Sequence, residues 1–265
     1  MFDIIPATIP LPVALAALIL AAILIGVSKS GFAGSTAILA VPLVANVIPV
    51  KQTLGFLLPL LILGDIAAVI QHRHHNSWPH FRWITIGGVI GVILATLLLV
   101  ILVSHTQALA LLLQFLVGLL CMIAVAFQFI RQMGGPLPHV PASPKAGYAC
   151  GILAGFVSTL TNAAGPITTL YMLEQKLSKQ IFTSTTVLIF LTLNLVKVPT
   201  YLAFGFISFN AMWLTLICLP AVPIGSLIGI WMHHRVPEKV FLYIIYLATL
   251  AASFSLLYKA IVSIL

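Results

Sequence analysis

The chain has 265 residues, of which 62% are hydrophobic and only 6% are charged, and its formal net charge is +8. Soluble domains carry about 25% charged residues, so this composition excludes a soluble protein and indicates one multi-pass membrane domain over residues 1–265. The basic residues stand singly in short loops. This distribution indicates that they orient the protein in the cell membrane by the positive-inside rule and do not bind nucleic acid.

The first predicted element is a broken apolar segment. Apolar runs at Leu11–Val27 and Ala37–Val47 flank a stretch of serine, lysine and glycine. Both runs are shorter than the ~20 residues of a comfortable span, and polar backbone within lipid is tolerated only where it lines a cavity. The pattern predicts a re-entrant hairpin with its tip inside the membrane. Asp3 and the lack of Lys or Arg before Leu11 argue against a cleaved signal peptide.

Three full spans follow the first hairpin, and a linker then divides the chain. The spans are predicted at Lys51–Ile70, Phe81–Val103 and Gln107–Ile130. Residues 132–145 are rich in Pro and Gly, which is typical of a linker. The first half is therefore about residues 11–131.

The second half, residues 146–265, repeats this plan. It opens with two short apolar runs around a Ser/Thr/Asn/Gly break and continues with three long apolar segments. The runs are Ala146–Val157 and Ile167–Leu173, and the spans are Lys179–Phe204, Ser208–Met232 and Glu238–Leu265. Matching features in the same order support a duplication: Ala33-Gly34 with Ala164-Gly165, Lys51-Gln52 with Lys179-Gln180, Asp65 with Asn194, and Gly87-Gly91 with Gly225-Gly229.

The basic residues distinguish two topologies. If each broken segment crossed the membrane once, the basic residues would divide evenly between the two sides. If each broken segment returns to its own side, only Lys51 and Lys259 lie opposite the others, as the positive-inside rule favours. The prediction is an all-α polytopic protein with two inverted repeats, each a re-entrant hairpin plus three transmembrane helices.

Lys29 is the most informative candidate for binding. An ammonium at a helix break offers three donors, hydroxyls add more, and glycines allow close approach to the backbone. A half-helix starting near Ser35-Thr36 would add positive potential from its N-terminus. Intramembrane ionisable residues are usually functional, although Lys29 could instead snorkel to an interface. The predicted substrate-binding residues of this tip are Ser28, Lys29, Ser30, Gly31, Gly34, Ser35 and Thr36.

The second tip is uncharged and is expected to complete a polar cage with Thr161, Asn162 and Gly165. Gly147, Gly151 and Gly155, spaced by four just before this tip, are assigned to helix packing.

Two further charged residues lie deep in predicted spans. Lys197 is a second candidate cation for the substrate, or a structural partner of Asp65. Asp65 could neutralise Lys29 or Lys197, or it could take up a coupling proton. The sequence leaves these roles open.

The sequence contains no motif typical of an enzyme, a metal site or a cofactor site. There is no Gly-x-Ser-x-Gly, Walker loop or pair of carboxylates. The histidines at 72, 74, 75 and 80 fit no zinc spacing and are interpreted as part of a solvated loop near Trp78 and Trp83. The three cysteines are interpreted as small packing residues. We predict no enzyme activity, no metal and no cofactor.

The pattern resembles the TauE/SafE sulfite exporter family over essentially the whole chain. The resemblance rests on the broken first helix with Gly-Phe-Ala-Gly-Ser-Thr, the Ala164-Gly165-Pro166 tip and three flanking motifs: Val41-Pro42-Leu43, Lys51-Gln52-Thr53 and Phe182-Thr183-Ser184-Thr185. Many members carry a run of glycines at the tips, where this chain has Ser30-Gly31-Phe32-Ala33-Gly34 and Asn162-Ala163-Ala164-Gly165. The resemblance implies transport of sulfite, organosulfonates or related sulfur-containing anions by ion-coupled secondary transport.

The functional prediction is a secondary transporter that holds a small anion between the two tips at the midplane of the membrane. One half or bundle would rock against the other, with a proton or another ion as coupling partner. The alternatives are an anion channel, a carrier of another small organic anion such as a carboxylate, and a membrane enzyme or assembly subunit acting on lipid, against which the missing catalytic pairs argue.

Overall fold

The computed structural model describes residues 4–30, 36–71, 76–102, 106–135, 140–235 and 238–263, and these residues form helices and connecting turns only. An all-helical chain is what lipid favours, because a helix satisfies its own backbone donors and acceptors. The helices are α1 (Leu11–Ser30), η1 (Thr36–Leu39), α2 (Ala40–Ala45), α3 (Val50–Gln71), α4 (Trp78–Leu102), α5 (Thr106–Gln132), α6 (Pro144–Thr161), α7 (Gly165–Glu174), α8 (Lys179–Ala203), α9 (Phe209–Cys218), α10 (Ala221–Arg235) and α11 (Glu238–Val262).

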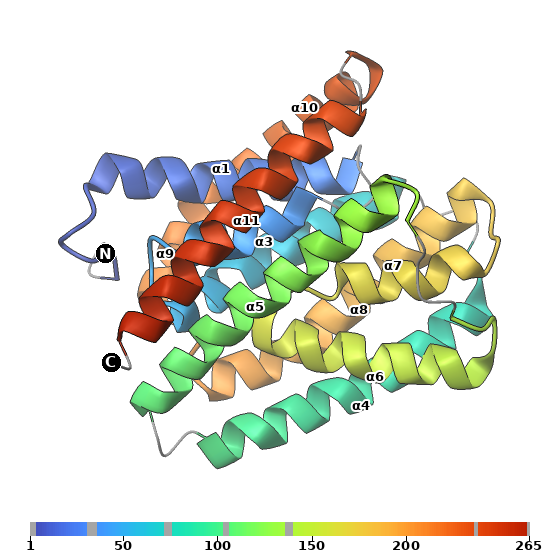
Figure 1. Cartoon of the computed structure of the whole chain (residues 1–265), viewed down its shortest axis with the longest axis horizontal. Helices are drawn as coiled ribbons and strands as arrows, with labels where there is room; N and C mark the ends of the chain where they lie inside the picture. The colour runs from blue at the N-terminus through green and yellow to red at the C-terminus, as the bar shows by residue number, and fades with distance from the viewer. Residues whose placement is uncertain are drawn as a thin grey trace.

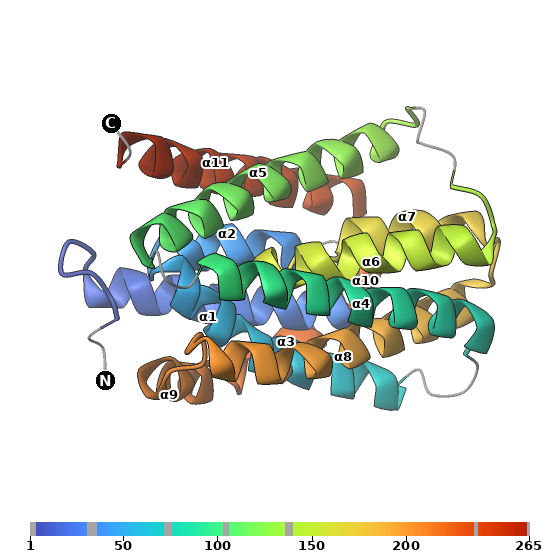
Figure 2. The ribbon, with the colours of Figure 1, turned by 90° about the horizontal axis from the view of Figure 1, so that it is seen from below.

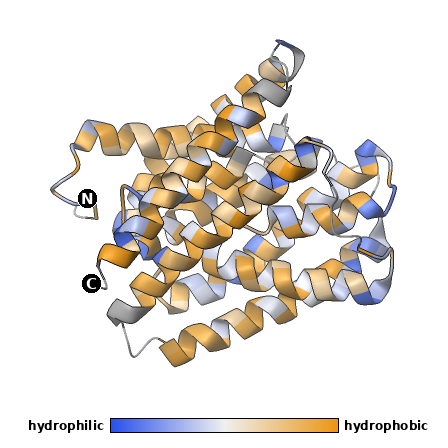
Figure 3. Ribbon diagram, in the orientation of Figure 1, coloured by the Kyte–Doolittle hydropathy of each residue, from blue (hydrophilic) through white to orange (hydrophobic). Residues whose placement is uncertain are grey.

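The long helices lie roughly side by side along the longest axis of the molecule (Figure 1). Six of them are long and apolar enough to cross a membrane, namely α1, α3, α4, α5, α8 and α11. Their bodies are hydrophobic along most of their length, and hydrophilic residues gather near the helix ends (Figure 3). Large apolar side chains such as Ile101 on α4 and Phe254 on α11 are more than half exposed, as expected for a surface that faces lipid. The chain is therefore a multi-pass membrane protein.

Five of the six predicted full spans correspond to α3, α4, α5, α8 and α11. The sixth, Ser208–Met232, is two helices, since α9 and α10 meet at a bend of 40°. Pro220 lies at this bend, where its missing N–H and its ring prevent a continuous helix.

The prediction that the first apolar run is too short to span is also wrong. The helix α1 continues through Ser28 and Lys29 to Ser30, so it has 20 residues. Lysine is a good helix former, and a cation in the last turn interacts favourably with the helix dipole. The predicted half-helix after the break is η1 followed by the six residues of α2 rather than one helix.

The direction of the chain reverses within the second hairpin. In Figure 2, α6 starts at the same end of the bundle at which α7 finishes, so the turn between them lies inside the bundle. The helix α1 starts at the opposite end of the bundle (Figure 2). The return of each hairpin to its own side of the membrane and the inverted arrangement of the two halves stay predictions.

Helices of the first half pack on helices of the second half, so the two halves do not form separate bundles. The helix α1 packs on α10 and α4 packs on α6, while α5 pairs with α11 and α3 with α8. Glycines at the crossings allow the helices to lie very close together. A Cβ on Gly26 would lie 2.1 Å from Val222 O, and one on Gly155 would lie 2.0 Å from Gly88 O. Gly147 and Gly151 also meet α4, so the assignment of the three α6 glycines to packing is confirmed.

Labelling of single cysteines tests the predicted sidedness. In a background without the native cysteines, Lys51→Cys at the start of α3 is expected to react with an impermeant maleimide only from outside the cell. Lys179→Cys at the start of α8 is the matched control and should react only from the cytoplasmic side, where basic loops accumulate. Reaction of position 51 from the cytoplasmic side alone would contradict the topology.

Candidate functional site

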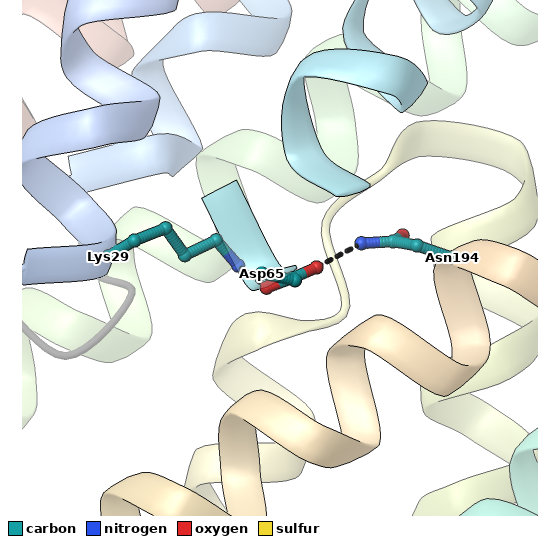
Figure 4. Close-up of polar contacts among 3 residues, drawn as sticks. All are labelled: Lys29, Asp65 and Asn194. Atoms are coloured by element: carbon teal, nitrogen blue, oxygen red, sulfur yellow. Dashed lines mark hydrogen bonds and ion pairs between the residues drawn. The ribbon is translucent and has the colours of Figure 1, made fainter. Parts of the chain in front are cut away.

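Asp65 is a buried carboxylate at the centre of the bundle. Lys29 reaches it from the last turn of α1 and forms an ion pair, in which the two side chains are 8% and 0% exposed. Asn194 on α8 approaches from the other side, and its Nδ2 donates to Asp65 Oδ2 over 2.7 Å (Figure 4). The sequence leaves three roles open for Asp65. In the structure its carboxylate pairs with Lys29, which corresponds to the role of neutralising that lysine.

The environment of the Lys29 ammonium is partly aromatic. Its Nζ lies 5.0 Å from the centroid of the Phe190 ring on α8. Gly64, next to Asp65, provides room for the lysine stem, since a Cβ there would lie 3.2 Å from Lys29 Cγ. The position of this cation is therefore fixed by three helices, α1, α3 and α8.

The α6–α7 turn, Asn162-Ala163-Ala164, is shorter than the predicted break. The hydroxyls of Thr159 and Thr161 bond to the carbonyls of Gly155 and Val157, at 2.8 and 2.9 Å. These residues therefore continue the helix, with their hydroxyls engaged by its own backbone. Asn162 then ends α6 in the left-handed conformation at φ 55°, which asparagine tolerates better than most residues.

Lys197 lies behind this turn and is fully buried. Its Nζ is 2.8 Å from Asn162 Oδ1 and 2.9 Å from Ser158 Oγ. The hydroxyl of Tyr201 donates to Thr159 O at 2.9 Å and to Asn162 Oδ1 at 3.2 Å. These contacts hold the side chain of Asn162 in one orientation, in which its oxygen faces the lysine.

A cavity of about 60 Å³ lies between the end of α1 and the α6–α7 turn, and we call it the central cavity. Its wall combines the Lys29 ammonium, the amides of Asn162 and Asn194 and the open backbone at Gly165. The lining residues are Lys29, Ala37, Ile38, Leu61, Ser158, Asn162, Ala163, Ala164, Gly165, Pro166, Phe190 and Asn194. Elements from both predicted hairpins therefore meet at one cavity.

The structure brings together some of the predicted binding residues but not others. Lys29, Asn162 and Gly165 line the central cavity, whereas Ser28, Thr161 and Lys197 do not. Gly31, Gly34 and Ser35 lie outside the described residues, and the side chains of Ser30 and Thr36 are likewise not described.

Sequence reasoning missed Ser158, Asn194 and Phe190 as lining residues. A signal for Asn194 was present, because it occupies the place in the second half that Asp65 occupies in the first. Phe190 offered no such signal, since one phenylalanine in an apolar helix is not distinguishable from its neighbours.

A second cavity, of about 160 Å³, lies on the other side of the same turn and is lined by apolar residues. It shares Ala163 and Pro166 with the central cavity, so the turn separates the two spaces. The other lining residues come from α5, α6 and α7.

A metal centre finds no support in the part of the chain that the structure describes. Within those residues, no three His, Cys, Asp or Glu side chains are grouped to hold an ion. His80 Nδ1 instead lies 2.6 Å from Ser77 Oγ at the start of α4. The histidines at 72, 74 and 75 lie outside the described residues.

Comparison with known proteins gives one family match. A family model described as sulfite exporter TauE/SafE matches residues 18–256, which is nearly the whole chain and includes every residue of the central cavity. Comparisons with curated proteins and with solved structures found no match.

Proposed function

The chain belongs to the TauE/SafE sulfite exporter family, and we propose that it moves sulfite or a small organosulfonate through the central cavity. The family consists of membrane transporters for sulfur-containing anions. The proposal concerns the finer points: which anion is carried, where it binds and how it passes.

One observation carries the proposal: the central cavity joins the Lys29 ammonium to the donors of a second, uncharged tip. One water needs about 10–15 Å³, so the cavity of about 60 Å³ suits a group of four or five heavy atoms. Sulfite, with one sulfur and three oxygens, matches this size. The sulfonate head of a larger substrate matches it as well.

The donors in the cavity wall favour a ligand that only accepts hydrogen bonds. Lys29 offers an ammonium, which has no acceptor. The oxygen of Asn162 is engaged by Lys197 and Tyr201, and Nδ2 donates one proton to Leu54 O at 3.3 Å, so the second N–H is left to bind a ligand. Sulfite and sulfonate oxygens are acceptors of this kind.

Alternating access requires two bodies that move relative to one another. The close crossings of α1 with α10 and of α4 with α6 join each hairpin to the opposite half of the chain. We therefore favour moving bodies that mix the two halves over a motion of one half against the other.

Filling the cavity tests the site without breaking a contact. Gly165 has no neighbour within 4 Å of an added Cβ, so Gly165→Leu is expected to fold and to occupy the space of the anion. Uptake of labelled sulfite into proteoliposomes should fall at least tenfold relative to the unmodified protein. Saturable uptake by the unmodified protein is expected for a carrier, whereas a linear conductance would indicate a channel.

The matched control is Ala110→Leu, which introduces the same side chain on the exposed surface of α5. Its uptake should equal that of the unmodified protein. Unchanged uptake in Gly165→Leu would refute the central cavity as the binding site, and no sulfite flux in the unmodified protein would refute the substrate.

A further inference from the structure

Lys197 is a fully buried lysine whose three contacts satisfy either protonation state. Its Nζ lies 2.8 Å from Asn162 Oδ1, 2.9 Å from Ser158 Oγ and 3.4 Å from Ser158 O. The two carbonyl oxygens can only accept, whereas the hydroxyl can donate or accept. An ammonium donates to all three atoms. A neutral amine donates to the two carbonyls and accepts the Ser158 hydroxyl, so loss of the proton leaves every group paired.

The charge of the interior depends on this lysine. Asp65 and Lys197 are the charged side chains among the fully buried residues that the structure describes, and Lys29 is nearly buried and paired with Asp65. The Lys29–Asp65 pair is neutral as a whole. The interior is therefore neutral when Lys197 is an amine and carries one positive charge when Lys197 is an ammonium. An uncompensated charge at this depth is costly, so the ammonium form favours a bound anion.

Among the ionisable groups around Lys197, Lys197 itself is the group whose protonation state can change, because its neighbours are paired or distant. Asp65 on α3 and Lys29 on α1 act on it electrostatically with opposite signs and are paired with each other. Tyr201, one turn later on α8, donates its proton to Thr159 O and Asn162 Oδ1. Lys51, in the first turn of α3, lies over the Phe206 ring at 5.8 Å from the centroid. The remaining ionisable residues on the packed helices lie near helix ends other than those at the α6–α7 turn: His80 and Arg82 near the start of α4, Lys145, Tyr148 and Cys150 in the first two turns of α6, Tyr171 and Glu174 in the last turn of α7, and Lys179 at the start of α8.

We propose that Lys197 carries the coupling proton, so that one singly charged anion and one proton cross the membrane together. The proposal rests on the proposed function, because it assumes that the anion occupies the central cavity. Ser158 and Asn162 line that cavity and also bind Lys197, so they connect the anion site to the proton site.

The transport cycle keeps the interior neutral at each stage. In the empty state Lys197 is an amine and accepts the Ser158 hydroxyl. When an anion enters, a proton from water binds the Nζ lone pair, the Ser158 hydroxyl turns to accept, and the ammonium balances the anion. On the other side the anion leaves, and the proton returns from Nζ to water.

Electroneutrality is the direct test of this coupling. In proteoliposomes of the unmodified protein, at an acidic pH that keeps labelled sulfite as the singly charged hydrogen sulfite ion, net flux is expected to be unchanged when a potassium diffusion potential is imposed with valinomycin. Net flux that follows the imposed potential would overturn the proton coupling while leaving sulfite transport intact. Absence of any sulfite flux would overturn the proposed function itself.

A variant with a fixed charge provides the second test. Arginine cannot release its proton, so Lys197→Arg should retain exchange of internal for external sulfite but lose net flux by at least tenfold. Lys145→Arg, at the exposed start of α6, is the matched control and should retain both activities. Full net flux in Lys197→Arg would contradict the proposal. If this variant does not fold, the potential measurement on the unmodified protein decides alone.

Discussion

Replacement of Lys29 by alanine is expected to abolish sulfite transport and to destabilise the protein by about 3–5 kcal/mol. The lysine is both the cation of the central cavity and the partner of Asp65. Its removal leaves a fully buried carboxylate without a paired cation, and among the described residues the bond from Asn194 is the one that stays. The loss of stability is measured by unfolding in detergent, and the loss of transport by sulfite uptake into proteoliposomes.

A double variant separates these two effects. Lys29→Met together with Asp65→Asn replaces the ion pair by two neutral side chains of similar length, so no buried charge is left without a partner. Removing both members of a buried pair is often nearly neutral for stability. We therefore expect the double variant to recover most of the stability but none of the transport. Full uptake in Lys29→Ala or in the double variant would contradict the role of Lys29 in binding.

The second large effect is expected from a single methyl group. A Cβ at Gly155 on α6 would lie 2.0 Å from the backbone oxygen of Gly88 on α4, a distance that real Cβ atoms essentially never show. Backbone cannot turn aside as a side chain can, so Gly155→Ala must separate the two helices. We expect a loss of about 4 kcal/mol or more, beyond the usual range for a point mutation. The measurement is the monodisperse fraction after detergent extraction, followed by thermal unfolding.

Gly165→Ala is the matched control, since an added Cβ there meets nothing within 4 Å. The change should leave the stability within about 0.5 kcal/mol of the unmodified protein. Equal stability of the two alanine variants would show that the close crossing of α4 and α6 is not as described.

Composition and local pattern predicted most of the fold. Apolar runs of about 20 residues or more are long enough to cross the lipid, and each forms one long helix in α3, α4, α5, α8 and α11, whereas the run at 208–232 is bent. The ends of the hairpin helices were predicted less well. The sequence pattern places Thr159 and Thr161 in the break, yet their hydroxyls bond to carbonyls of α6 and both residues extend that helix.

The candidate site was predictable only in part, because its chemistry depends on contacts between distant segments. The sequence identified Lys29, Asp65, Asn162 and Lys197 as polar groups within lipid, but spacing cannot say which of them pair. The Lys29–Asp65 ion pair joins residues 36 positions apart, and the bond from Asn194 to Asp65 spans 129 positions. The number of residues between two side chains along the chain carries no information about such partners.

The exchange of hairpins between the halves has a consequence for the origin of this architecture. The first hairpin helix, α1, finds its closest partner in α10, and α6 finds its own in α4. If the two halves arose by duplication, as the sequence predicts, a single repeat would have left the apolar face of its hairpin uncovered, and it would have needed a second, antiparallel copy to cover that face. Such a dimer would dissociate on dilution, whereas fusion of the two genes would keep the halves together at any concentration.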